Sequence, residues 1–154
     1  MQITANFSLD EMTKSQTALR NGINNMPDPI HLHNLHGLCH NILQPVREHF
    51  GRPVTVSSGF RSVELCLAIG SSSASQHAKG QAADFEVIGI DNKEVAEWIR
   101  DNLDFDQLIL EFYNEGEPQS GWIHCSYAGT DEFGIEHNRK AVLRYDGKKY
   151  MNGF

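Results

Sequence analysis

The chain has 154 residues, of which 40% are hydrophobic, and it carries a formal net charge of −7 with a pI near 5.5. This length and apolar content predict one globular domain over residues 1–154 that buries its own core. The acidic balance argues against a nucleic-acid binder, which would carry a basic patch or stripe. No run approaches the roughly 18 apolar residues that mark a membrane-spanning helix, so we expect no membrane insertion.

The first helix begins at a capping box, Ser8-Leu9-Asp10-Glu11, in which Ser8 is the N-cap and Glu11 reaches back. Its expected apolar face consists of Leu9, Met12 and Leu19. The segment Asn24–Pro29 is rich in Pro, Asn and Asp and ends any helix before it. The N-terminus lacks the basic and apolar regions of a signal peptide, which predicts synthesis in a cytoplasm without such a signal.

The longest helical pattern runs from Ile30 to Phe50. Apolar residues recur there every three or four positions, as expected for an amphipathic helix: Leu35, Leu38, Ile42, Val46 and Phe50. Pro45 inside this pattern predicts a kink or a break into two segments.

The middle of the chain alternates short elements with loops. We expect a strand at Val54–Ser57, a short helix at Ser62–Ile69, a serine-rich loop at Ser71–Ser75 and a strand at Gln81–Val87. A second capping box at Asp91–Glu94 opens a helix. Its expected core positions are Val95, Trp98, Ile99 and Leu103.

Strands dominate the second half. The expected strands are Gln107–Phe112, Trp122–Tyr127, and the pair Ala141–Tyr145 and Lys148–Met151, which flank the hairpin signal Asp146-Gly147. Helices come mostly first and strands later, without regular alternation. This order predicts an α+β fold with a mostly antiparallel sheet flanked by helices.

Strand alternation separates the residues that could carry chemistry from those of the core. On Gln81–Val87 the apolar side chains share one face, which leaves Asp84 on the opposite, open face. On Trp122–Tyr127, His124 and Cys125 point in opposite directions, so we interpret Cys125 as a core residue. If the two strands are neighbours, Asp84 and His124 converge, and His77 reaches them from the loop.

Two imidazoles and one carboxylate form a borderline-soft set of three ligands. Such a set suits zinc with a fourth position open to water, the arrangement of catalytic rather than structural sites. The alternative is a solvated loop histidine, a capping aspartate and an unrelated buried histidine. Spacing alone favours that alternative, because a histidine and an aspartate seven residues apart are common by chance. Cys39, Cys66 and Cys125 form no CxxC pair, so reduced core thiols are expected.

A larger pattern resembles the M15 peptidases, the group of D-Ala-D-Ala carboxypeptidases and phage endolysins, and within it the phage and prophage branch. The residues that carry the resemblance are Ser75, His77, Gly80, Ala82, Asp84, Trp122, His124 and Ser126, together with Phe7–Met12, Ser15-Gln16 and Val56–Ser62. The resemblance covers nearly the whole chain. It implies a zinc fold shared with the hedgehog signalling domain, Zn²⁺ ligation by His77, Asp84 and His124, and a monomer.

The resemblance also bears on the general base. Many relatives place a glutamate three residues before the last histidine, where this chain has Gly121. In another subset the glutamate closes an earlier strand, and Glu111 matches that pattern. The alternative for Glu111 is a strand-end charge turned toward solvent. Glu115 and Glu117, in a polar loop, are weaker candidates.

Two further residues match family positions near the substrate. Arg61 corresponds to an arginine that binds substrate beside the metal, and a guanidinium suits a peptide carbonyl or carboxylate; the alternative is a surface arginine. Ser75 either hydrogen-bonds substrate or a ligand, or packs the loop. The pair His36 and His40 lacks the glutamate of an HExxH motif, so we interpret it as the margin of the helix.

The resemblance implies zinc-dependent hydrolysis of peptide bonds in bacterial peptidoglycan stem peptides, by a D-Ala-D-Ala carboxypeptidase or endopeptidase of the endolysin type. The protein would act at the bacterial cell wall or be carried in a virion. The alternative function is a non-catalytic, zinc-stabilised binding or virion-associated module with the same fold. A metal-free virion structural protein is a third, weaker hypothesis.

Overall fold

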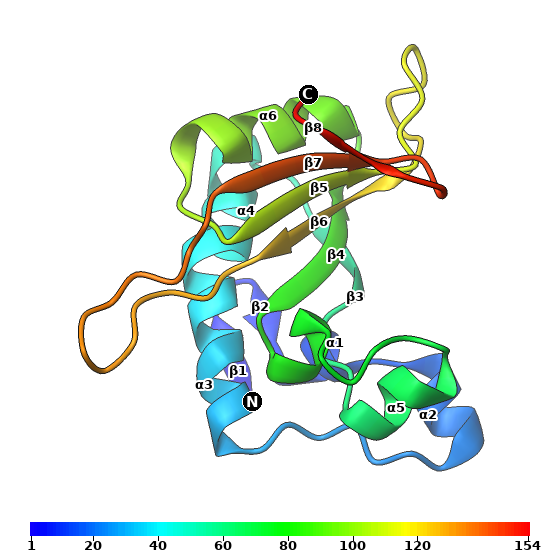
Figure 1. Ribbon diagram of the computed structural model, residues 1–154, viewed down its shortest axis with the longest axis vertical. Coiled ribbons are helices and arrows are strands. Elements are labelled where there is room, and N and C mark those ends of the chain that lie inside the picture. Colours follow the sequence, from blue (N-terminus) through cyan, green and yellow to red (C-terminus); the bar gives the residue numbers. More distant parts are fainter.

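A six-stranded sheet with the strand order β3-β4-β6-β5-β7-β8 forms the centre of the fold (Figure 1). The computed structural model describes all residues 1–154. The strands of this sheet are β3 (Val54–Ser58), β4 (Ala82–Val87), β5 (Gln107–Glu111), β6 (Trp122–Ser126), β7 (Ala141–Tyr145) and β8 (Tyr150–Asn152). A separate two-stranded sheet pairs β1 (Gln2–Thr4) with β2 (Phe7–Ser8).

Helical segments lie before β3, between β3 and β4, and between β4 and β5. They are α1 (Leu9–Thr13), α2 (Gln16–Asn21), α3 (Pro29–Leu38), the π-helical segment η1 (Cys39–Leu43), α4 (Gln44–Phe50), α5 (Val63–Ala68), the 3₁₀ turn η2 (Gln76–Lys79) and α6 (Asn92–Asn102). None of them has the length and apolar character that crossing a membrane requires.

Every pair of neighbouring strands in the large sheet is antiparallel except β5 and β7, which run parallel. The predicted α+β fold with a mostly antiparallel sheet is therefore confirmed. One cluster of 23 buried residues joins the sheet to the helices, so the fold has one main core. Phe85 and Ile123 contribute to it from the sheet, Ile42 from the long helix and Ile99 from α6. The core lies on one face of the sheet, and Asp84, Glu111 and His124 lie on the other, which we call the open face.

The sequence pattern predicts a kink or a break at Pro45, and the structure shows no break there. Instead the chain winds more widely through η1, where the Gln44 N–H donates to the carbonyl of Cys39, five residues earlier. This wider turn comes just before Pro45, which has no N–H to donate. Ile42 and Val46, on either side, are both fully buried. The helix therefore stays continuous, because these apolar side chains belong to one buried stripe along it.

Other local expectations need correction. Ser8 caps α1 as predicted, because its Oγ accepts the N–H of Glu11. The helix then ends at Thr13, and a second helix begins at Gln16 with Ser15 as N-cap. Leu19 belongs to that second helix and is 76% exposed, so its assignment to the apolar face was wrong.

Asp106, at the start of β5, ties distant segments to the sheet. It is buried, and its carboxylate accepts hydrogen bonds from Arg139 at 2.8 and 3.0 Å and from the Gln76 amide at 2.8 Å. The long loop before β7 and the η2 turn are therefore anchored at the same point. Burial alone would raise the pKa of Asp106, but the hydrogen bonds from Arg139 and Gln76 outweigh it and hold the pKa below its ordinary value.

Replacing Asp106 with Asn tests this anchor. A lowered folded-state pKa stabilises the protein above the unfolded pKa of about 3.9, and this stabilisation is lost as the pH falls through the folded value. We expect Asp106→Asn to lower the free energy of unfolding by about 2 kcal/mol at pH 7 and by less at pH 3, in urea denaturation. Asp104→Asn, at an exposed position nearby, should change it by under about 0.5 kcal/mol. Equal losses for both variants at both pH values would contradict the anchor.

Candidate metal centre

The η2 turn places His77 beneath the open face of the sheet. Ser75 caps the turn, since its Oγ accepts the N–H of His77 at 3.2 Å. Gly80 ends it with a φ of +74°, a conformation that favours glycine, and a Cβ there would lie 2.4 Å from the carbonyl oxygen of His31. The turn is thus held tightly against α3. His77 is only 5% exposed as a result.

The loop after β3 fixes the His77 ring. The Nδ1 atom of His77 lies 2.8 Å from the carbonyl oxygen of Gly59, and because a carbonyl only accepts, Nδ1 carries the proton. Nε2 is then left with its lone pair and faces Asp84 Oδ2 at 3.5 Å. In return, the backbone N–H of Arg61 donates to the backbone carbonyl of His77 at 3.1 Å. This reciprocal pair is the outer support that metal-binding histidines ordinarily have.

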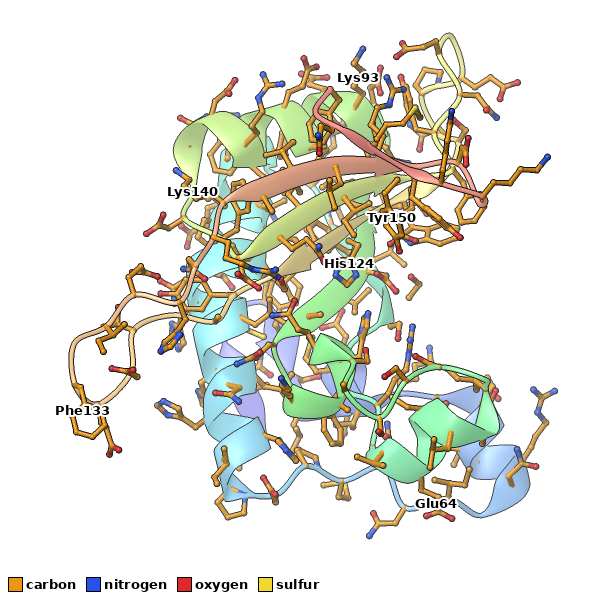
Figure 2. All side chains as sticks on the ribbon, in the orientation of Figure 1. Glu64, Lys93, His124, Phe133, Lys140 and Tyr150 are labelled. Atoms are coloured by element: carbon orange, nitrogen blue, oxygen red, sulfur yellow. The ribbon has the colours of Figure 1, made fainter.

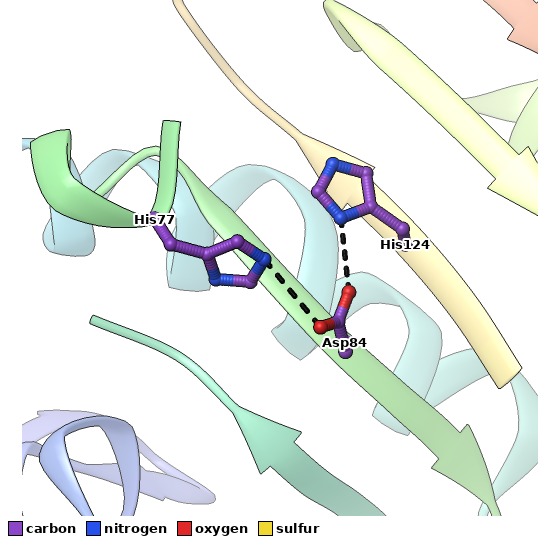
Figure 3. Close-up of side chains that lie close together, drawn as sticks. All are labelled: His77, Asp84 and His124. Carbon is purple, nitrogen blue, oxygen red and sulfur yellow. Dashed lines mark hydrogen bonds and ion pairs between the residues drawn. The ribbon is translucent and has the colours of Figure 1, made fainter. Parts of the chain in front are cut away.

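The register of β4 against β6 brings the other two side chains together. Asp84 and His124 are directly opposite each other, and Asp84 Oδ1 lies 2.9 Å from His124 Nδ1. Figure 3 shows both histidines converging on the carboxylate from different elements. Cys125 points to the core and is fully buried, as alternation predicted, and this burial raises the pKa of its thiol.

His77, Asp84 and His124 form a suitable set of ligands for a metal ion. Their ligand atoms lie within 4.8 Å of one another. The lone pair of His77 Nε2 faces the site, and His124 presents Nδ1 to it. Burial would raise the pKa of Asp84, but the imidazoles of His124 and His77 beside it outweigh burial and lower the pKa. Two imidazoles and an ionised carboxylate with no fourth protein ligand fit zinc in a catalytic site.

Glu111 ends β5 beside this ligand set. Its Oε1 lies 4.0 Å from His124 Nδ1, and its side chain is 17% exposed. Phe112 and Trp122 stand next to it with their ring centroids 5.1 Å apart. Burial, and then the negative charge of Asp84, raise the pKa of Glu111 above its ordinary value. The strand-end carboxylate therefore faces the site rather than bulk solvent.

The alternative position for a catalytic glutamate is closed by the backbone. Gly121 has a φ of +63°, and a Cβ there would lie 1.9 Å from the carbonyl oxygen of Glu111. No side chain fits at that position without moving β5. Glu115 and Glu117 have other partners, because Glu115 contacts Lys93 and Arg144 while Glu117 accepts from the Asn114 amide. Glu111 thus remains as the carboxylate beside the three ligands.

Arg61 reaches the site from the loop after β3. Its Nη2 lies 3.3 Å from Asp84 Oδ2, and its Nε donates to Ser58 Oγ at 2.6 Å. Arg61 is therefore not a free surface arginine. Sequence reasoning did not assign roles to Ser58 and Gly59, the residues that orient Arg61 and His77. The signal that could have identified them is their position just before Arg61, within the stretch Val56–Ser62 that carries the family resemblance.

The remaining predicted residues lie outside the centre or have structural contacts. Ser75 uses its Oγ to cap η2, which is the loop-packing alternative, and a contact with substrate stays a prediction. His36 and His40 stack on each other with ring centroids 6.1 Å apart on the margin of the long helix. His137 pairs with Asp131 at 2.8 Å in the exposed loop before β7.

Comparison with known proteins agrees with this geometry. A family model described as Peptidase M15 matches residues 5–126, which include His77, Asp84, Glu111 and His124. The strands β7 and β8 lie beyond the matched region. Among curated proteins, none is significantly similar to the chain.

The three ligands can be tested by metal binding alone. We expect one zinc ion per wild-type chain, and we expect His77→Ala, Asp84→Ala and His124→Ala each to weaken zinc binding by more than the roughly 10–100-fold typical of outer partners. Competition with a chromophoric chelator measures this. His40→Ala removes an exposed histidine and should leave the affinity unchanged. Unchanged affinity in all three ligand variants would contradict the site.

The close approach at Gly121 can be tested by its stability cost. Gly121→Ala adds both a strained φ and a clash with the backbone of β5, whereas Gly116, with a φ of +84°, has no atom within 4 Å of a built Cβ. Gly116→Ala should therefore cost only about 1–2 kcal/mol. We expect Gly121→Ala to cost clearly more in urea denaturation. Equal costs would show that position 121 is not closed.

Proposed function

The chain belongs to the peptidase M15 family, and we propose that it uses zinc to hydrolyse a peptide bond in the stem peptides of bacterial peptidoglycan. The observation that carries the proposal is the convergence of two histidines, one aspartate and Glu111 on one open face of the sheet. Membership of the family supports a metal-dependent peptidase. The peptidoglycan substrate, the phage or prophage branch and the endolysin role are the finer part of the proposal.

The residues that would hold zinc are His77 through Nε2, Asp84 through its carboxylate and His124 through Nδ1. A zinc ion bound there would act as a Lewis acid and lower the pKa of a bound water molecule. The chain itself fixes the ligand orientations: Gly59 holds the ring of His77, and the β4–β6 register holds the other two. This preorganisation removes the need to rearrange ligands during the reaction.

Glu111 is the proposed general base. It accepts a proton from the attacking water and then delivers that proton to the amine that leaves when the peptide bond breaks. A pKa raised by burial and by Asp84 suits both steps, because the carboxylate binds the proton more readily than an exposed glutamate would. The rings of Phe112 and Trp122 provide apolar surroundings beside it.

Arg61 is the proposed substrate-binding cation. Its Nε is fixed by Ser58, while its Nη2 lies near Asp84 at the edge of the ligand set. A planar guanidinium held in this way donates to a carbonyl oxygen of the substrate or to a terminal carboxylate. The same contact would stabilise negative charge that develops on the carbonyl oxygen.

The bond proposed for cleavage involves a D-residue, either the terminal D-Ala-D-Ala bond or a stem-peptide crosslink. The protein would work as a monomer at the bacterial cell wall, or be carried there in a virion. A non-catalytic binding module would be favoured by an absent or misplaced Glu111. The 4.0 Å distance from Glu111 to His124 favours the catalytic hypothesis instead.

Defined muropeptides test the proposal. Wild-type protein with zinc should release products detectable by mass spectrometry, and a chelator should stop the release. Glu111→Gln should lower the rate by about 10²–10⁴-fold while zinc binding persists, because only the proton acceptor is lost. Glu115→Gln, an exposed glutamate in the next loop, should keep full activity. Undiminished hydrolysis by Glu111→Gln would remove Glu111 from the mechanism, and a lack of products from wild-type protein would refute the substrate.

A further inference from the structure

A groove of about 500 Å³ adjoins the metal centre. It lies between the α1–α2 junction, the edge strand β3 and α5, and Arg61 is one of its lining residues. Since Arg61 Nη2 is 3.3 Å from Asp84 Oδ2, the groove meets the ligand set at this side chain. A molecule in the groove would therefore lie next to the proposed scissile bond.

The charge of the groove is opposite to that of the whole protein. Of its eleven lining residues, Lys14 and Arg61 are cationic and none is acidic, in a chain with a net charge of −7. Lys14 is exposed and has no carboxylate within ion-pair distance. The acidic residues Asp10 and Glu11, one turn earlier on α1, do not line the groove. A cation without a partner in such a groove is suited to an anionic group of a ligand.

The wall of the groove suits an extended peptide. Residues 55–58 of β3 line it, and β3 is the outermost strand of the sheet, so one side of its backbone has no strand partner. Extended peptides bind to such edges through main-chain hydrogen bonds. Ile69, which follows α5 and is 44% exposed, adds apolar surface to the groove.

We propose that this groove binds the peptide substrate on one side of the scissile bond and that Lys14 pairs with a carboxylate within that peptide. The carboxylate belongs to an internal residue of the substrate, and Arg61 receives the peptide at the end nearest the metal ligands. The position of the scissile bond rests on the proposed function. The preference for an acidic peptide rests on the groove alone.

Binding of two matched peptides tests the proposal. The probes are a stem peptide with its internal carboxylate free and the same peptide with that group converted to a carboxamide. Zinc-loaded Glu111→Gln protein prevents turnover during calorimetry. We expect it to bind the acid about three- to fivefold more tightly than the carboxamide, the range of an exposed ion pair. Adding Lys14→Gln should abolish this difference, and adding Lys14→Arg should preserve it.

A matched lysine controls for a general charge effect. Lys93 lies at the start of α6. Figure 2 shows it far from Glu64, a residue of α5. Lys93→Gln should leave the preference for the acid unchanged. Lys14 is exposed at the end of α1, and a urea denaturation curve for Lys14→Gln should match that of the parent protein.

The outcomes separate this proposal from the proposed function. Equal binding of both peptides by the parent protein, absence of binding, or a preference that survives Lys14→Gln would overturn the role of the groove. A preference that requires Lys14, in a protein whose wild-type form cleaves neither peptide, would support the groove and refute the hydrolysis. Cleavage of both peptides, with a binding preference that does not depend on Lys14, would support the hydrolysis and refute the role of the groove.

Discussion

The register between β4 and β6 is the constraint on which the site depends. Asp84 meets His124 only because Phe85 pairs with Ile123 on the core side, where both side chains are fully buried. A slip of one residue would turn each buried side chain to the open face and remove Asp84 from the site. The free energy of burying the core thus also fixes the geometry of two proposed metal ligands.

The third ligand depends on a different kind of contact. His77 and the loop after β3 hold each other through two hydrogen bonds, one from His77 Nδ1 to Gly59 and one from the Arg61 N–H to His77. Ser58, the last residue of β3, orients Arg61, which lies in the same loop. The proposed metal ligand His77, the proposed substrate-binding residue Arg61 and the end of the groove are therefore coupled, and a change in the loop would displace them together.

Sequence reasoning reached the parts of the molecule that follow local periodicity. The side of Asp84, His124 and Cys125 followed from strand alternation, which requires only that one face be apolar. The geometry of His77 did not follow, because η2 is stabilised by partners such as Gly59, eighteen residues away. The sequence predicts a kink or a break at Pro45, and the structure has a π-helical turn just before it in a helix that does not break, with Ile42 and Val46 buried on either side. The groove combines three segments that no local pattern connects.

Gly121 limits how this site can change by mutation. With its α-carbon packed against the carbonyl of Glu111, this turn accepts a carboxylate at the end of β5 and excludes one three residues before His124. In this backbone a carboxylate side chain fits at position 111 and not at position 121. A single substitution cannot move the carboxylate from one to the other, because the turn must be rebuilt first.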